Sequence, residues 1–220
     1  IDGQGVGGAL VRSTELCEPP SKTRLWGGRP GSPVAKWPQR QALSLRQILY
    51  IYGKNRIMDY PIVLKSQFLD RMTDDEFFHF CVEHPNLRIE RSADLEITIM
   101  SPTGGVTSHI EAEIGFQLLL WNHQSKLGRV SNSNGAFHLP NRAIWAPDAA
   151  FVTSEKWNAL SEREQMSFPN IVPDFIVEVR SFSDPIKQLR AKMEGWIEVG
   201  VSLAWLIDPF REFSEIYRVG

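Results

Sequence analysis

A strand, a helix and a second strand follow one another with short connections near the end of the chain. The two apolar, strand-like runs are 174–179 and 201–207. Between them, Asp184 is placed to cap a helix, Pro185 suits its first position, and Gly200 ends it. Two strands joined by one helix in this way lie parallel in a single sheet. The sequence therefore predicts an α/β domain.

Residue periodicity predicts the other elements of this domain. Two helices are expected to begin at capping boxes, formed by Thr73 with Glu76 and by Ser108 with Glu111. The dipeptide 134–135, Asn-Gly, predicts a hairpin. The expected strands cover 87–91, 94–100, 128–133, 136–139, 144–152 and 213–219, and the two helices are expected to end near 83 and 126. Together these elements predict a mixed β-sheet flanked by helices.

Two carboxylates lie inside short, β-rich apolar runs. Asp148 lies within 144–152, and Glu178 lies within 174–180. A carboxylate in such a run is costly to bury unless it is paired or binds a metal. Two of them on adjacent strands would form an all-oxygen site that suits Mg²⁺. The alternative is that both are strand-end residues that face water, and the spacing alone does not decide between the two.

Metal-assisted hydrolysis of a phosphodiester also requires a cation that supports the attacking water, and two residues are candidates. Arg180 is two residues after Glu178, so we expect both on the same side of the strand. However, arginine cannot accept a proton at neutral pH. Lys192 lies between Leu189 and Trp196, at the margin of the helix face that must pack on the sheet. Lys192 is therefore the favoured group.

The charge distribution divides the chain near residue 58. Residues 1–57 contain nine Lys and Arg and three Asp and Glu, whereas residues 58–220 contain fifteen and twenty-three. The first segment is rich in Gly and Pro and lacks periodicity, so we expect it to be disordered or to lie outside the domain. A basic arm that touches a polyanion is the alternative. The net charge of −8 over 58–220 argues against a strong non-specific nucleic-acid binder.

Hydropathy and cysteine content bear on the cellular setting. No run of about 18 apolar residues is present, so we expect no membrane association. Cys17 and Cys81 are too few for a disulfide framework and lie in no CxxC motif. We therefore expect a reducing, cytoplasmic location.

Several short motifs resemble one bacterial family in their order and spacing. The matching stretches are 99–102 followed by His109, 146–152, 173–179, 183–184, 192–193 and 200–209. On these stretches, residues 58–220 resemble the Uma-two family of restriction-endonuclease-like proteins, within the PD-(D/E)xK nuclease superfamily. The resemblance implies a restriction-endonuclease-like α/β core. Because that family continues with more sheet, we expect the domain to be truncated at its C-terminus.

The resemblance also implies a metal-dependent nuclease site. Asp148 and Glu178 would bind Mg²⁺ or Mn²⁺, and the carbonyl of Val179 would help. The usual lysine of the E-x-K element would have moved to the following helix as Lys192, and Glu90 matches an acidic position near such sites. We therefore expect an endonuclease that hydrolyses DNA phosphodiester bonds with metal-activated water, and we allow for a homodimer. The alternative is a catalytically inactive binding or regulatory protein of the same fold.

Two further residues stay open between a functional and a structural role. His109, near a helix start, either contacts substrate or satisfies a local hydrogen bond. Glu111 either caps its helix or is the auxiliary acid that superfamily members sometimes place there.

Overall fold

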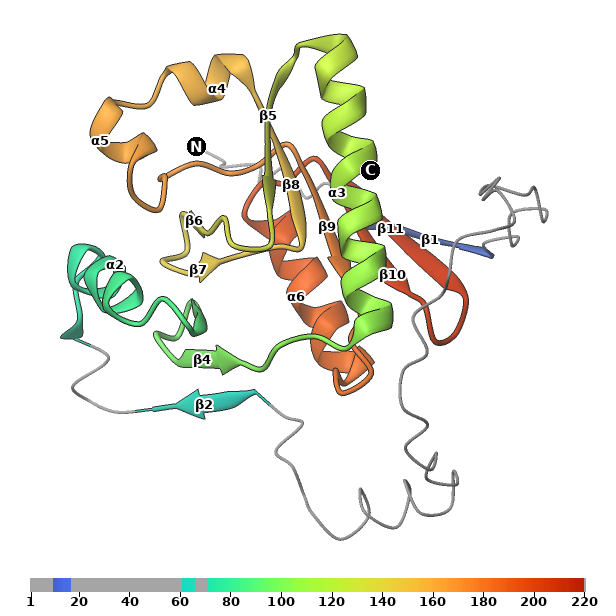
Figure 1. Cartoon of the computed structure of the whole chain (residues 1–220), viewed down its shortest axis with the longest axis horizontal. Coiled ribbons are helices and arrows are strands. Elements are labelled where there is room, and N and C mark those ends of the chain that lie inside the picture. Colours follow the sequence, from blue (N-terminus) through green and yellow to red (C-terminus); the bar gives the residue numbers. More distant parts are fainter. Residues whose placement is uncertain (1–9, 17–60, 66–70, 220) are drawn as a thin grey trace, which may run out of the picture. The chain divides into compact units, whose positions relative to one another are not determined.

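The computed structural model describes residues 10–16, 61–65 and 71–219. The strands are β1 (Leu10–Leu16), β2 (Ile62–Leu64), β3 (Arg88–Arg91), β4 (Ile97–Met100), β5 (Gly128–Asn132), β6 (Phe137–His138), β7 (Ile144–Trp145), β8 (Ala149–Thr153), β9 (Phe175–Val179), β10 (Leu203–Asp208) and β11 (Phe213–Val219). The helices are α2 (Asp74–Glu83), α3 (Gly105–Ser125), α4 (Ser154–Asn158), α5 (Glu162–Gln165) and α6 (Ile186–Glu198), as Figure 1 shows.

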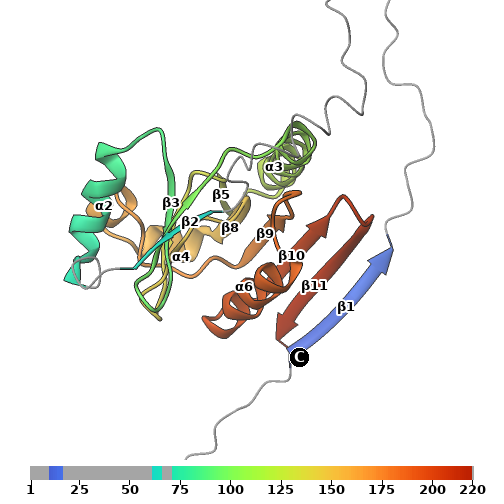
Figure 2. The ribbon, with the colours of Figure 1, turned by 90° about the horizontal axis from the view of Figure 1, so that it is seen from below.

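The larger sheet is mixed and has the strand order β1-β11-β10-β9-β8-β5. Strands β9 and β10 are parallel and are joined through α6, while the other neighbours are antiparallel. Met193 and Trp196 of α6 pack with Ile176, whereas Ile110 of α3 packs with Val177. Because side chains alternate along a strand, the two helices cover opposite faces of this sheet (Figure 2). The predicted restriction-endonuclease-like fold class, a mixed sheet flanked by helices, is confirmed.

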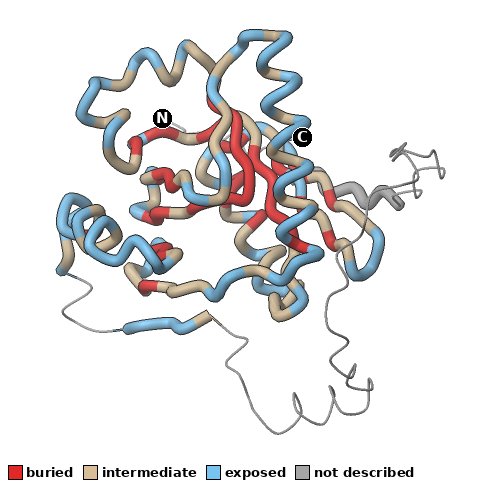
Figure 3. The backbone as a smooth tube through the Cα atoms, viewed as in Figure 1, coloured by how far each residue is buried: buried red, intermediate tan, exposed pale blue. Residues whose placement is uncertain are grey.

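The smaller sheet is antiparallel and has the order β2-β4-β3-β7-β6. Helix α2 packs on it through Phe77, which is fully buried against Ile89 and Ile97. This helix begins at the predicted capping box, in which the Thr73 hydroxyl accepts from the Glu76 amide and the Glu76 carboxylate accepts from the Thr73 amide. Figure 3 shows that buried segments run along the strands of both sheets.

Two strand predictions were wrong because the chain passes from one sheet to the other. The run 144–152 is not one strand: β7 belongs to the smaller sheet and β8 to the larger. Pro147 lies in the break between them, and proline has no amide hydrogen for a ladder. The hairpin expected at 134–135 is absent as well. A turn forms there, with the Gly135 amide donating to Asn132, but β5 pairs with β8 and β6 pairs with β7.

Two helix starts differ from the predicted ones. Helix α3 begins at Gly105 with Gly104 as its N-cap, so the expected capping box of Ser108 and Glu111 does not exist. Helix α6 has Pro185 as its N-cap, one residue later than predicted, which is within the usual uncertainty of a helix end.

Strand β1 lies inside the segment 1–57 that was expected to be disordered. Its backbone pairs antiparallel with β11 over seven residues, so the expectation is wrong for Leu10–Leu16. The other residues of 1–57 lie outside the described part of the chain, and the domain boundary at 58 stays a prediction. Among the described helices, none is long and apolar enough to cross a membrane.

Candidate active site

The sheet register brings Asp148 opposite Glu178. Ala149 pairs with Val177 and Ala150 with Ile176 in the antiparallel ladder of β8 and β9, so one step outward pairs Asp148 with Glu178. Residues opposite each other in such a ladder have Cβ atoms about 5 Å apart. Both side chains leave the sheet on the face that α6 covers, because Ala150 and Ile176 pack in the same cluster as α6.

Asp148 is buried and is held by one amide and one guanidinium. Its Oδ2 accepts from the amide of Val179 at 2.7 Å, and its Oδ1 accepts from Nη2 of Arg88 at 3.1 Å. Burial raises the pKa of Asp148 to about 7, with a further contribution from the negative charge of Glu178, while Arg88 acts in the opposite direction. The two carboxylates thus lie close enough to repel each other in the absence of a shared cation.

Glu178 is held by two side chains of α6. Its Oε1 accepts from the indole Nε1 of Trp196 at 3.0 Å and lies 2.9 Å from the ammonium Nζ of Lys192. Lys192 and Trp196 are four residues apart, so they lie one turn apart on the same face of the helix. That face packs on the sheet through Trp196, which is fully buried, and this contact brings the lysine over the end of β9.

Glu90 reaches the same ammonium from the smaller sheet. Its Oε1 accepts from Nζ of Lys192 at 3.0 Å and from the amide of Ala146 at 3.0 Å. Lys192 therefore bridges one carboxylate from β3 and one from β9. The four residues named for catalysis come together where the two sheets meet, at the break between β7 and β8. Their roles stay predictions.

The charge state of Lys192 limits its chemistry. Burial by itself would lower the pKa of Lys192, but the adjacent carboxylates of Glu178 and Glu90 outweigh burial and raise the pKa above its ordinary value. The side chain is therefore a firm ammonium and a poor proton acceptor. It can stabilise negative charge on a nearby group, but it cannot deprotonate water in this state.

The donor set suits a hard divalent cation. Asp148 and Glu178 supply two carboxylates, and Val179 supplies a carbonyl. The Val179 amide bonds to Asp148, and the amide and carbonyl of one residue in a strand point to the same side, so this carbonyl also faces Asp148. Among the described residues, no group of three or more His, Cys, Asp and Glu is arranged to hold a metal ion. Two carboxylates and a carbonyl are a smaller set, of the oxygen type that Mg²⁺ prefers, and they fit the predicted site.

Comparison with known proteins places the chain in a family. Residues 74–220 match the model of the Uma2 family, whose description is "Putative restriction endonuclease". The chain belongs to the Uma2 family. The match includes Glu90, Asp148, Glu178 and Lys192, and the sequence resemblance to this family is thereby confirmed. No curated protein matches the chain.

A solved structure resembles the Uma2 chain in fold. It is the crystal structure of a protein from Anabaena variabilis described as a "putative nuclease belonging to DUF820". The two are 20% identical, the TM-score is 0.54, and the match covers 67% of this chain and 79% of the other. At this identity the likeness supports the shared fold alone.

Arg180 has no described contact with Asp148, Glu178 or Glu90. Its Nη1 donates to Oδ2 of Asp208 at 3.0 Å, and its Nε donates to the carbonyl of Asp184 at 3.0 Å. Asp208 is fully buried at the end of β10. Leu206 pairs with Glu178 in the ladder of β9 and β10, so Asp208, two residues later, lies on the same face of the sheet as Glu178. The contact with Asp208 therefore agrees with the expected side of the strand, but the ion pair of Arg180 is with Asp208 and not with the carboxylates of the site.

Sequence reasoning missed Arg88 and left Glu111 open. Arg88 is two residues before Glu90, and this spacing on one strand was a usable signal for a shared face. Glu111 is partly buried, and its Oε1 is buried without a hydrogen-bond partner among the described residues. Burial raises its pKa, and the charges of Arg88 and Glu178 also act on it. His109 is exposed in the first turns of α3.

Proposed function

We propose that this Uma2 protein is a Mg²⁺-dependent endonuclease that hydrolyses phosphodiester bonds in DNA. One observation carries the proposal: Asp148 and Glu178 are opposed, buried carboxylates, and the Lys192 ammonium joins Glu178 to a third carboxylate, Glu90. Three carboxylates, Asp148, Glu178 and Glu90, lie around two cations, Lys192 and Arg88. This excess of acid favours a site that binds a further cation.

The chain's own residues would each make a distinct contribution. Asp148, Glu178 and the Val179 carbonyl would hold the Mg²⁺ or Mn²⁺ ion. When bound, the ion supplies a charge against a phosphate oxygen and lowers the pKa of a water molecule. The Val179 amide fixes Asp148 and the Trp196 indole fixes Glu178, so both carboxylates are oriented before any ligand arrives. Lys192 would stabilise the negative charge that develops on the phosphate.

The rival is a Uma2 domain that binds or regulates without catalysis. The net charge of −8 over 58–220 favours it, because DNA binding gains most of its affinity from Lys and Arg contacts with phosphates. DNA as substrate, a cytoplasmic location and a homodimer all belong to the proposal.

A nuclease assay separates the two functions. The wild-type protein is incubated with supercoiled plasmid and with single-stranded DNA, in Mg²⁺, in Mn²⁺ and in EDTA. Metal-dependent nicking supports the endonuclease, and Asp148→Asn, Glu178→Gln and Lys192→Met are each expected to lower the rate at least about 100-fold.

The matched controls for this assay are Glu198→Gln and Lys187→Met, at exposed positions of the same helix, α6. Both should cleave at the wild-type rate. If the site variants cleave as fast as these controls, the cleavage comes from a contaminant or from another site. DNA binding without cleavage in any metal would favour the non-catalytic rival.

A further inference from the structure

Arg88 contacts Asp148, one of the proposed metal ligands. It is the first residue of β3, two residues before Glu90. Its Nη2 donates to the carbonyl of Ala146 at 2.9 Å and to Oδ1 of Asp148 at 3.1 Å. Glu90 accepts from the amide of the same Ala146 at 3.0 Å, so the two side chains hold this backbone unit from both ends.

One atom of Arg88 has no partner. Its Nε is buried and makes no hydrogen bond among the described residues. A guanidinium that served only to clamp Ala146 would be expected to use its donors fully, because an unmade buried hydrogen bond is costly. Its position is therefore not explained by the backbone contact alone.

The charges around Arg88 match those that a metal would meet. Its guanidinium donates to Asp148, and the carboxylates of Glu90 and Glu178 lie near enough to attract its charge as well. Lys192 touches Glu178 and Glu90 but has no described contact with Asp148. Arg88 is thus the cation in direct contact with Asp148 in the described part of the chain.

We propose that Arg88 is an internal counter-cation that competes with the divalent metal for Asp148, so that metal binding requires the Arg88–Asp148 contact to break. The inference rests on the proposed metal site, because it concerns the same carboxylate. It assigns Arg88 a positioning role that lowers metal affinity in the wild-type protein and holds Asp148 in place while the metal is absent.

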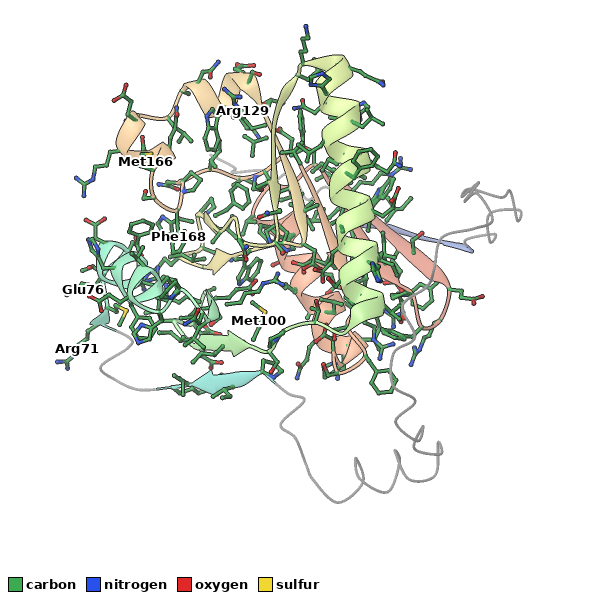
Figure 4. All side chains as sticks on the ribbon, viewed as in Figure 1. Arg71, Glu76, Met100, Arg129, Met166 and Phe168 are labelled. Atoms are coloured by element: carbon green, nitrogen blue, oxygen red, sulfur yellow. The ribbon has the colours of Figure 1, made fainter. Side chains whose placement is uncertain are left out.

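The test is Mn²⁺ affinity, measured by isothermal titration calorimetry on the full chain without DNA. Arg88→Met removes one positive charge next to Asp148, so Mn²⁺ should bind about tenfold tighter or better. The control Arg129→Met makes the same change at an exposed residue of β5, which Figure 4 places near α4 and away from α6. It should leave the affinity within about twofold of wild type.

A second variant separates competition from clamping. Arg88→Gln carries no charge but keeps an amide that can donate to the Ala146 carbonyl. We therefore expect this variant to fold even if Arg88→Met does not. It should also bind Mn²⁺ more tightly than wild type. In the wild-type protein, the NMR chemical shift of the Arg88 Nε–H group should change when Mg²⁺ is added. The Nε proton should also exchange faster with solvent.

The outcomes distinguish this inference from the proposed function. If wild type binds Mn²⁺ and the Arg88 variants bind equally or more weakly, Arg88 only clamps the backbone and the competition is refuted. If neither wild type nor the Arg88 variants bind metal, the metal site fails and this inference fails with it. If the Arg88 variants bind tightly but no protein cleaves DNA, the competition stands and the endonuclease does not.

Discussion

Replacing Lys192 by methionine should destabilise the metal-free protein by about 3 kcal/mol. The ammonium lies 2.9 Å from Glu178 and 3.0 Å from Glu90, and the lysine side chain is 19% exposed. Each charge pair at this distance contributes about 6 kcal/mol at an effective dielectric constant of about 20. Methionine avoids the cost of burying an ammonium, which offsets most of this gain, but it leaves two buried carboxylates without their cation.

The assay is urea unfolding in EDTA, with a thermal scan beside it. A loss of about 3 kcal/mol should lower the Tm by roughly 6–12 °C in a domain of this size. The control is Lys187→Met, at an exposed position of the same helix, which should change stability by less than about 0.5 kcal/mol.

A double-mutant cycle ties the loss to the ion pair. Glu90→Gln keeps an oxygen that can accept from the Ala146 amide but removes the charge that Lys192 contacts. The double variant Lys192→Met, Glu90→Gln should therefore be more stable than the sum of the single effects implies, by about 1–3 kcal/mol. Additive effects, or a Lys192→Met protein as stable as wild type, would refute the view that the ammonium holds the acidic cluster together.

Three other predictions follow from packing and burial, and chemical unfolding measures the first two. Gly128→Ala should lower the free energy of unfolding by about 3 kcal/mol, because a Cβ there would lie 2.0 Å from the Val152 carbonyl oxygen. The control Gly115→Ala lies on α3 with open space around it, so it should raise the free energy of unfolding by about 0.5–1 kcal/mol. Phe77→Ala should lower the free energy of unfolding by about 3–5 kcal/mol in the same assay, because this ring of α2 is fully buried against the smaller sheet. Burial raises the pKa of Cys81 to about 11, so its alkylation, followed by peptide mass spectrometry, should be slow at pH 8 and quicken about tenfold per pH unit toward 11; fast labelling at pH 8 would contradict this.

Local signals predicted those elements whose ends and faces are encoded by neighbouring residues. The capping box of Thr73 and Glu76 fixed the start of α2, and the apolar stripe of α6 with the runs on either side predicted the parallel pair β9 and β10. The same kind of evidence failed at the Asn-Gly turn of 134–135. The turn forms, but a turn does not determine which strands pair, and here the two flanking strands joined different sheets.

The residues of the site could be predicted in part, because some of them carry a local signal. Asp148 and Glu178 stand out because each is a carboxylate in an apolar run, and family resemblance supplied Glu90 and Lys192. What the sequence hides is the set of contacts between them: Lys192 is 102 residues from Glu90, and Arg88 is 60 residues from Asp148. No periodicity extends over such separations.

The break at Pro147 explains why these residues meet. If 144–152 were a single strand, Asp148 would lie in its middle, paired on both sides and away from the smaller sheet. Because the chain instead leaves one sheet and enters the other there, Ala146 is free to bond to Arg88 and Glu90, while Asp148 bonds to Val179. The backbone interruption that defeated the strand prediction therefore places acids from two sheets around a single lysine. Any substitution that restored a continuous strand would separate Glu90 from Glu178 and abolish the site without removing any of its side chains.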